Sequence, residues 1–527
     1  MTELKFNLLD EPWIIVTNLQ GKEETLSLTE VLVRSHGLKS LSGEMPSQDV
    51  AILRLLLGVM YAIYTRTEEY KNAKGKNCLE IWKNIWDGGC FSEDIIKDYF
   101  EQWKDRFDLL DPERPFYQIA GLDDGTHAGI ERMIGDADRF FQSRNINNEV
   151  SIMYPEAARW LLYLNAYDTI TMAPNRRKNL RVGLLGQLNI VYALGESLFE
   201  TLMLNFRLYQ HNKKPWRSGQ AAWELDVPRM GDRTEIPLPE SGEELFTLQS
   251  RRICLKHKDG MVFGAVVYGG DYFDPINAFA EPMTTWKFDE ETSSYSYDMP
   301  YDKAASKQMW RDFASFFVQS DKEKLPGVVE WVSELASKNL IPKSYVTFSN
   351  LIMRYRKGSL VTDIWSDSLS VNANLLSRLE DGEEGWIIRI TNIVELTEEL
   401  VKILGSLASN LDIAAGSSEG NHSRTIAKEQ AYAALDMPFR NWLADIDPKK
   451  DDMDDTCKTW VDVARKIILK HGENLVAEAG TQAFIGRNAK NPISKKEEYY
   501  SAPKVYGWFE GSISKKLKDE GYGKVGV

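Results

Sequence analysis

The chain has 527 residues, enough for about three domains of ordinary size. Apolar residues make up 43% of it and charged residues 27%, a composition typical of a folded protein and not of a disordered one. The 64 Lys and Arg are outnumbered by 78 Asp and Glu, giving a net charge of −14. This charge excludes a protein that coats nucleic acid with its whole surface, so any contact with DNA must be local.

Cysteine usage and hydropathy favour a reducing, aqueous compartment. The four cysteines lie far apart and form no CxxC pair, which argues against a disulfide scaffold and a cysteine zinc site. The N-terminal MTELKFNLLDEPW lacks the basic and apolar regions of a signal peptide. The longest strongly apolar run, residues 55–64, is much shorter than the ~20 residues that span a bilayer. We expect a cytoplasmic protein without a membrane partner.

Mixed elements are predicted up to about residue 370. In chain order, the hydrophobic patterns indicate a strand, a helix, a helix that follows Pro155, a further apolar helix and two paired strands. These elements fall at residues 13–16, 48–65, 156–166, 194–206, and 251–255 with 261–267.

The pattern changes after residue 370, where apolar residues recur at helical spacing. Four helices are predicted at residues 386–411, 424–444, 455–471 and 495–517. The acidic residues 451–455 lie where the third of these helices begins, where carboxylates favour the positive end of the helix dipole. Four helices with short connections are typical of an antiparallel bundle. We therefore predict an α+β protein with two domains, a mixed α/β body at residues 1–370 and a four-helix bundle at residues 371–527.

No enzyme signature is present. The sequence has no phosphate-binding GxxxxGK[ST] loop, no GxGxxG, no HExxH and no GxSxG. The six histidines do not fall at metal-ligand spacing on one helix face. We predict no catalytic residue, no metal and no cofactor. A metal-dependent nuclease or hydrolase with a scattered site stays as the alternative.

Three short cationic segments stand out against the acidic background. The segment PNRRKNLR at residues 174–181 can contact phosphates and base edges. The segment RYRKGS at residues 354–359 places a tyrosine among three cations and reaches a glycine, where backbone can approach closely. The segment PMTTWKF at residues 282–288 places one lysine between aromatic residues. For each segment the alternative is an ordinary solvated or half-buried loop, and the residues alone leave that choice open.

The opening FNLLDEPWI, at residues 6–14, resembles the N-terminal signature of the large subunit of Cascade, the type I-E CRISPR surveillance complex (the CasA family). Further stretches resemble family elements in the same order. These are PFYQ at 115–118, EAARWL at 156–161, GESLFETLMLN at 195–205 and PFRNWL at 438–443. The resemblance covers essentially the whole chain.

The resemblance implies a binding subunit without catalytic activity. Family members sit among the other Cascade subunits near the 5′ handle of the CRISPR guide RNA. They recognise the protospacer-adjacent motif in double-stranded target DNA, help to open the duplex and recruit a helicase-nuclease. Guide pairing then reads the long sequence, while the protein reads only a short motif. A purely structural scaffold subunit is the further alternative.

Site residues follow from the resemblance position by position. The family approaches the minor groove with a glycine-rich loop, and the matching residues here place cations where the family has glycines. These residues are Asn175, Arg176, Arg177, Lys178 and Asn179.

Two other family contacts match single positions of this sequence. A lysine finger corresponds to Lys287. A glutamine wedge that splits the first base pair corresponds to Ser359, and serine is too short to replace a stacked base. The alternatives for the wedge are Tyr355, Arg356 and Lys357.

The guide-RNA handle and the displaced DNA strand have candidate contacts as well. By the same resemblance, the loop that contacts the handle begins at Phe140 and Phe141. Several bundle cations are candidates for lining the displaced strand, with a solvated helix face as the equal alternative. They are Arg424, Lys428, Lys490, Lys495 and Lys496.

Overall fold

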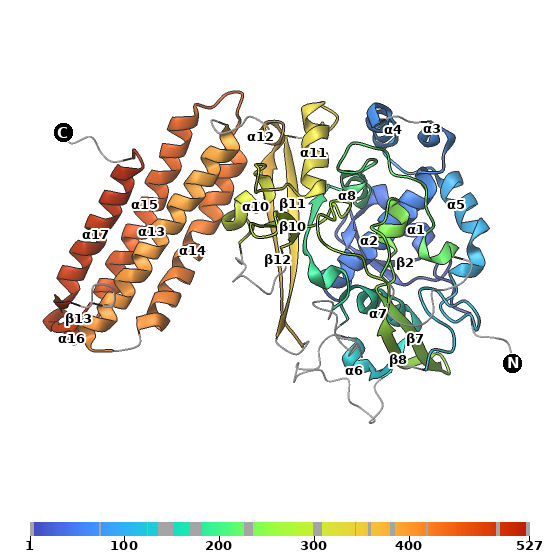
Figure 1. Ribbon diagram of the computed structural model, residues 1–527, viewed down its shortest axis with the longest axis horizontal. Helices are drawn as coiled ribbons and strands as arrows, with labels where there is room; N and C mark the ends of the chain where they lie inside the picture. Colours follow the sequence, from blue (N-terminus) through green and yellow to red (C-terminus); the bar gives the residue numbers. More distant parts are fainter. Residues whose placement is uncertain are drawn as a thin grey trace. The chain divides into compact units, whose positions relative to one another are not determined.

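The computed structural model divides the chain into two compact units. The first, called the body here, comprises Met1–Lys307, Gln319–Pro342 and Val346–Ser368, and the second, the helical unit, comprises Gln308–Val318, Lys343–Tyr345 and Leu369–Val527. The structure describes residues 5–72, 75–123, 125–134, 151–168, 182–225, 235–298, 308–342, 344–356, 360–379, 385–417, 420–491 and 496–522. The predicted fold class, a mixed α+β body with a C-terminal four-helix bundle, is confirmed (Figure 1).

The centre of the body is α2 (Pro46–Tyr64), predicted at residues 48–65. It is buried at every position from Val50 to Tyr64, because its apolar residues surround the whole helix. Among the described residues it is the one helix long and apolar enough to cross a bilayer, and 94% of that stretch is buried inside the protein. The apolar residues of α2 are therefore those of a helix in the protein core.

The body also contains several small sheets. The predicted strand at residues 13–16 is β1 (Ile14–Asn18), between β2 (Glu23–Leu26) and β3 (Leu38–Leu41). The predicted strand pair is β7 (Arg251–Lys258) with β8 (Met261–Gly269), which pair antiparallel. Strand β8 also pairs with β4 (Thr126–Gly129) and β5 (Ile152–Met153). Both strand predictions are confirmed.

Two helix predictions in the body had different outcomes. The predicted helix after Pro155 is α7 (Tyr154–Tyr167). The predicted helix at 194–206 is wrong in its first third, because β6 (Asn189–Leu194) ends there and α8 (Leu198–Asn205) starts later. The Ser197 hydroxyl accepts the Glu200 N–H at 3.2 Å and so fixes the start of α8.

Other body helices are short and lie around α2 and the sheets. They are α1 (Leu28–Val33), α3 (Glu68–Lys71), α4 (Gly75–Gly88), α5 (Glu93–Gln102), α6 (Ile130–Met133), α9 (Gly242–Phe246) and α11 (Gly327–Ser337).

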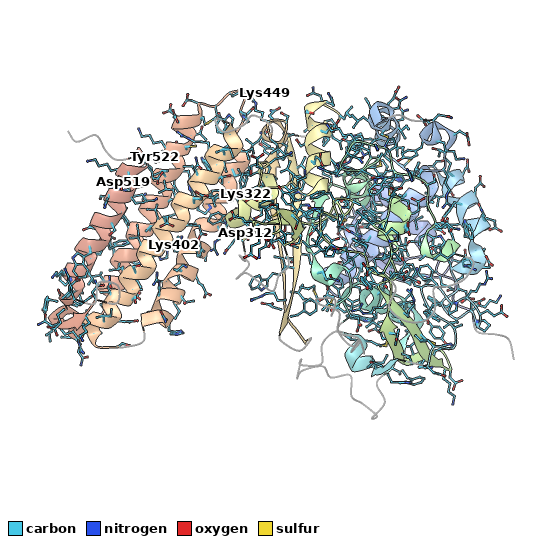
Figure 2. All side chains as sticks on the ribbon, in the orientation of Figure 1. Asp312, Lys322, Lys402, Lys449, Asp519 and Tyr522 are labelled. Carbon is cyan, nitrogen blue, oxygen red and sulfur yellow. The ribbon has the colours of Figure 1, made fainter. Side chains whose placement is uncertain are left out.

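Four long helices form the helical unit, as predicted. They are α13 (Trp386–Ala415), α14 (Gly420–Asp445), α15 (Met453–Ala477) and α17 (Ala502–Asp519), which lie side by side in Figure 1. The Asp452 carboxylate accepts the Asp455 N–H at 3.0 Å at the start of α15, which confirms the predicted role of the acidic run. Charged side chains such as Lys402, Lys449 and Asp519 are exposed on this unit (Figure 2).

The start of the fourth predicted helix is wrong. Between α15 and α17 the chain forms α16 (Thr481–Ile485) and a hairpin of β13 (Arg487–Lys490) with β14 (Glu497–Tyr500). Gly486 has a φ of 75°, a conformation that favours glycine and turns the chain into β13. Helix α17 then begins next to Pro503, which suits the first turn of a helix.

An early segment also belongs to the helical unit. It carries α10 (Phe313–Phe317), and short α12 (Ala373–Leu376) precedes α13. The Trp310 indole stacks on Phe439 with ring centroids 4.5 Å apart and donates to Asp436 Oδ1 at 2.9 Å. A segment that comes before the bundle in sequence therefore completes the bundle core.

Candidate nucleic-acid interface

One sheet of the body carries the start of the RYRKGS segment at one of its ends. It consists of β6, β11 (Tyr345–Arg356) and β12 (Leu360–Asn372), in the order β12–β11–β6. Strands β6 and β11 pair antiparallel, with Thr347 opposite Leu194 and Ile352 opposite Asn189. The last residues of β11 therefore continue past the point where β6 begins. The RYRKGS segment lies at this end, which we call the loop end of the sheet.

A third chain segment runs along the free side of β6 toward the loop end. The Val191 N–H donates to the Met283 carbonyl at 3.1 Å, and the Thr285 N–H donates to the Asn189 carbonyl at 3.4 Å. This antiparallel contact delivers the chain into β9 (Trp286–Asp289), which pairs with β10 (Ser294–Tyr297). Lys287 is exposed on β9, two residues after the segment passes Asn189.

The residues on both sides of the basic loop are also held near this end. Its residues 169–181 lie outside the described part of the chain, but both ends of the loop are described. The Gly183 N–H donates to the Asp168 carbonyl at 3.1 Å, so the two ends meet. A Cβ on Gly183 would lie 2.3 Å from the Ala166 carbonyl oxygen, and this approach admits only glycine.

A buried ion pair fixes one end of that loop. The Arg251 Nε lies 2.6 Å from Asp168 Oδ2, and both side chains are 0% exposed. Arg251 also donates to the Asp168 backbone carbonyl at 2.9 Å. This pair was not predicted from the sequence, although two adjacent arginines at the start of a strand that continues with Ile-Cys-Leu are a signal that buried acids lie nearby.

Tyr355 ties β11 to the same place. Its hydroxyl donates to the Tyr167 carbonyl at 3.2 Å, one residue before Asp168. A Cβ on Gly186 would lie 2.2 Å from the Tyr355 hydroxyl oxygen, so the ring lies close against the backbone there. Tyr355 is therefore half-buried at the loop base. Tyr355 is one of the candidates for the wedge, and its ring and hydroxyl are held by contacts with Gly186 and Tyr167 of the body.

Arg354, the preceding residue, contacts an aromatic side chain that was not among the predicted site residues. Its guanidinium carbon lies 4.4 Å from the centroid of the Trp365 ring on β12. The Trp365 indole N–H in turn donates to the Asp363 carboxylate. The paired strands thus present a cation on an aromatic face close to the loop end, an arrangement that also suits base stacking.

Several predicted site residues lie outside the described part of the chain. Of Arg356 the structure gives the strand position and not the side chain. The others are Asn175, Arg176, Arg177, Lys178, Asn179, Lys357, Ser359, Phe140 and Phe141. The predicted roles of all these residues stay predictions. What the structure adds is the position of the chain ends from which the segments 169–181 and 357–359 leave.

The bundle cations are spread over two places. Arg424 and Lys428 lie one turn apart on α14, and their stems pack within about 3 Å of the position a Cβ would take on Gly405 of α13. Lys490 and Lys496 are exposed on or next to the β13–β14 hairpin. Lys495 lies outside the described residues. The role of these cations along a displaced strand stays a prediction.

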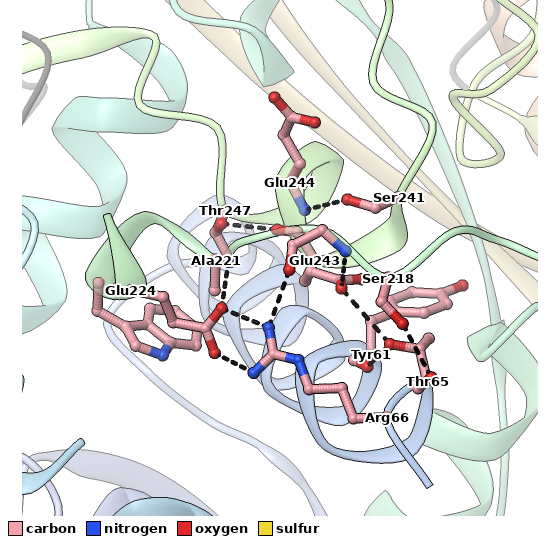
Figure 3. Close-up of polar contacts among 12 residues, drawn as sticks. Tyr61, Thr65, Arg66, Ser218, Ala221, Glu224, Ser241, Glu243, Glu244 and Thr247 are labelled. Atoms are coloured by element: carbon pink, nitrogen blue, oxygen red, sulfur yellow. Dashed lines mark hydrogen bonds and ion pairs between the residues drawn. The ribbon is translucent and has the colours of Figure 1, made fainter. Parts of the chain in front are cut away.

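One cluster of buried carboxylates in the body bears on the hydrolase alternative (Figure 3). Arg66 binds both carboxylate oxygens of Glu224, and the Tyr99 hydroxyl donates to the same side chain. Glu243 is 0% exposed and accepts the Gly219 N–H. Burial raises the pKa of Glu243. These carboxylates join α2 to neighbouring loops, and their burial closes them to a substrate.

A metal site can be tested on the described residues as well. Within that part of the chain, no three His, Cys, Asp or Glu side chains come together in a way that could hold a metal ion.

The family model described as CRISPR-associated protein Cse1 matches residues 7–471. The chain belongs to this family. The resemblance predicted from the motifs is thereby confirmed. Among known Cse1-family proteins, the chain is 27% identical over 328 residues to CRISPR-associated protein CasA/Cse1 of Thermus thermophilus. That match covers 59% of this chain and spans 60% of the relative's own length.

Solved structures resemble this Cse1-family chain over nearly its whole length. The crystal structure of Thermobifida fusca Cse1 is 26% identical, has a TM-score of 0.80 and matches 98% of each chain. A chain of a structure described as a CRISPR RNA-guided surveillance complex is 15% identical, has a TM-score of 0.69 and matches 97% of this chain and 99% of its own. At that identity the second likeness shows the fold alone.

Proposed function

We propose that this Cse1-family chain is the large, non-catalytic subunit of a cytoplasmic CRISPR RNA-guided surveillance complex that reads the protospacer-adjacent motif in double-stranded DNA. The observation that carries the proposal is the convergence at the loop end of the β12–β11–β6 sheet. The described ends of the basic loop, the last described residues of β11 and the segment that leads to Lys287 come together there. Their anchors, Asp168, Tyr355 and Thr285, are held by hydrogen bonds or a buried ion pair.

Charge distribution supports a local and selective contact. A chain of net charge −14 repels DNA as a whole, so binding must come from cations concentrated at one place. Phosphate contacts from the basic loop position the duplex, and side chains in the groove read the motif. A contact in the minor groove separates mainly A·T from G·C pairs, so several related motifs would be accepted.

Opening of the duplex is the second part of the proposal. A wedge inserted between base pairs must repay an unstacking cost of a few kcal/mol. The hairpin tip after β11 is the candidate for this role, with Arg356, Lys357 and Ser359 as the residues concerned. Since the hydroxyl of Tyr355 is used at the loop base, we assign Tyr355 a supporting role.

The partners follow from family membership and belong to the proposal too. We expect other Cascade subunits, the 5′ handle of the guide RNA near Phe140 and Phe141, and a separate helicase-nuclease that cleaves the target. In this division of labour guide pairing reads the long sequence, and the protein breaks no covalent bond.

A binding assay with the reconstituted complex tests the proposal. Alanine at Arg176, Arg177 and Lys178 together should weaken binding of motif-bearing duplex by about tenfold or more and make its salt dependence shallower. The matched control removes three exposed body lysines, Lys71, Lys83 and Lys97, which pair with acids on their own helices and should leave binding unchanged. Equal effects of the two triple variants would contradict the proposal.

The two alternatives predict other results. A scaffold subunit would give motif binding that is the same for the basic-loop variant and the unchanged chain. A metal-dependent nuclease would cut DNA with Mg²⁺ and stop with EDTA, whereas the proposed subunit leaves DNA intact in both conditions.

A further inference from the structure

The core of the body contains an ion pair between α2 and the segment before β9. Arg54 Nη1 lies 2.8 Å from Glu281 Oε1, and Nη2 lies 3.0 Å from Oε2, so both carboxylate oxygens are bound. The side chains are 4% and 0% exposed. The Arg54 guanidinium carbon also lies 4.3 Å from the centroid of the Phe246 ring. Because burying two charges costs about as much as their attraction returns, such a pair is weak evidence of a role in stability.

Glu281 has a second partner on its own segment. Its Oε1 accepts the Met283 N–H at 3.0 Å. The carbonyl of the same Met283 accepts the Val191 N–H of β6. The carboxylate therefore fixes the first residue of the segment that runs beside β6 and leads to Lys287. With both of its oxygens held by Arg54, this carboxylate has one orientation.

Arg54 also lies near residues that hold the base of the basic loop. Burial raises the pKa of the Tyr167 and Tyr297 hydroxyls, and the Arg54 charge opposes that rise. Tyr167 carries the carbonyl that binds Tyr355 and precedes Asp168 at the loop base. Tyr297 ends β10, the partner strand of β9. Arg54 also lines a small cavity together with Ala166 and Leu184, which lie on either side of the basic loop.

We propose that Arg54 and Glu281 act as positioning residues for motif recognition, a role that rests on the proposed function. They touch no DNA. Arg54 orients the Glu281 carboxylate, and the carboxylate sets where the segment 283–285 meets β6 and hence where Lys287 stands. The pair then determines how well the complex distinguishes a duplex with the motif from one without it.

Two double variants separate positioning from stability. Arg54→Met with Glu281→Leu removes both charges and the acceptor for the Met283 N–H. Arg54→Met with Glu281→Gln removes both charges but keeps an acceptor oxygen. Neither leaves a lone buried charge, so both should unfold within a few degrees of the unchanged chain. We expect the ratio of dissociation constants, without and with the motif, to fall by about tenfold in the Leu variant and to recover most of its value in the Gln variant.

A matched control makes the same change at another buried ion pair of the body. Arg252 and Asp271 are 2.7 Å apart, with side chains 2% and 8% exposed. Side chains alternate along a strand, so Arg252 points away from the face on which Arg251 holds the loop base. Arg252→Met with Asp271→Leu should leave the motif ratio unchanged.

The outcomes distinguish the inference from the proposed function. Suppose that the unchanged complex distinguishes the motif and that the Leu variant keeps the ratio of dissociation constants, without and with the motif, within twofold. That result would overturn the inference alone. If the complex without substitutions binds duplexes with and without the motif equally well, the proposed function and the inference are both overturned. Should the Leu variant fail to fold, Arg54→Lys replaces it, because a single ammonium nitrogen cannot form the two parallel N–H···O bonds that fix the plane of the Glu281 carboxylate. An unchanged motif ratio in a folded Arg54→Lys complex would then overturn the inference.

Discussion

Replacing Gly183 by alanine tests whether the base of the basic loop must close as tightly as the structure has it. The added Cβ would lie 2.3 Å from the Ala166 carbonyl oxygen and 2.7 Å from the Tyr167 nitrogen. An ordinary carbon–oxygen contact is about 3.3 Å, so the backbone must move by about 1 Å. These neighbours are backbone atoms, which give way less readily than the end of a side chain.

Overpacking of this kind costs roughly 1–3 kcal/mol of unfolding free energy. We expect Gly183→Ala to lower the thermal unfolding midpoint of the body by several degrees. We also expect a fall of about tenfold in affinity for motif-bearing duplex, since the substitution displaces the base of the basic loop. Calorimetry of the purified chain and a binding titration of the reconstituted complex measure the two effects.

A matched glycine provides the control. Gly507 lies inside α17, and nothing lies within 4 Å of the position its Cβ would take. Gly507→Ala should therefore stabilise the helical unit by about 0.5–1 kcal/mol and leave motif binding unchanged. If Gly183→Ala unfolded at the unchanged temperature and bound the motif normally, the tight loop base would not matter for recognition.

Three further changes have calculable effects. Burial raises the pKa of Asp49 to about 7, so its charge destabilises the fold as pH rises from about 4 to 7. Asp49→Asn should add roughly 1–3 kcal/mol of stability at pH 8, a gain that shrinks toward zero as pH falls to 4 in a pH series of unfolding curves. Tyr355→Phe removes the hydrogen bond to the Tyr167 carbonyl and should cost about 1 kcal/mol, with a severalfold loss of motif affinity. Trp310→Ala removes a fully buried ring stacked on Phe439 and should destabilise the helical unit by about 3–5 kcal/mol in calorimetry.

Each of these has an opposing result. A stability gain from Asp49→Asn that is the same at pH 4 and pH 8 would show that the substitution acts through packing and not through charge. Motif affinity unaffected by Tyr355→Phe would remove Tyr355 from the support of the loop base. A Trp310→Ala chain with an unchanged helical transition would mean that the segment before the bundle adds nothing to its core.

Periodicity predicted the long elements well, because their burial follows directly from the spacing of apolar residues. Helix α2 is buried around its whole circumference and α13 on one stripe, and both were predicted within a few residues. The prediction was wrong where a polar segment with helical propensity pairs with a strand instead. The EEYY run before α17, Glu497–Tyr500, pairs with β13 in a hairpin, and its charged residues gave no strand signal.

The candidate site was predictable in part. The local sequence identifies the basic runs, and the family resemblance identifies Lys287. Their convergence depends on the register of β6 with β11 and on the segment beside β6, which are contacts between residues more than 90 positions apart. The buried groups that anchor the segments, such as Asp168 with Arg251, are charged residues in the core, and sequence reasoning places charged residues at the surface by default.

Photo-crosslinking from β9 shows whether the loop end of the sheet reaches the motif. A photoreactive phenylalanine analogue at Lys287, in the reconstituted complex, should crosslink to the motif base pairs of a target duplex and lose that crosslink when the motif is replaced. The same group at Lys83, exposed on α4, should give no crosslink to the motif. Crosslinks of equal yield from both positions, or none from Lys287 under conditions where the duplex is bound, would contradict motif recognition at this end of the sheet.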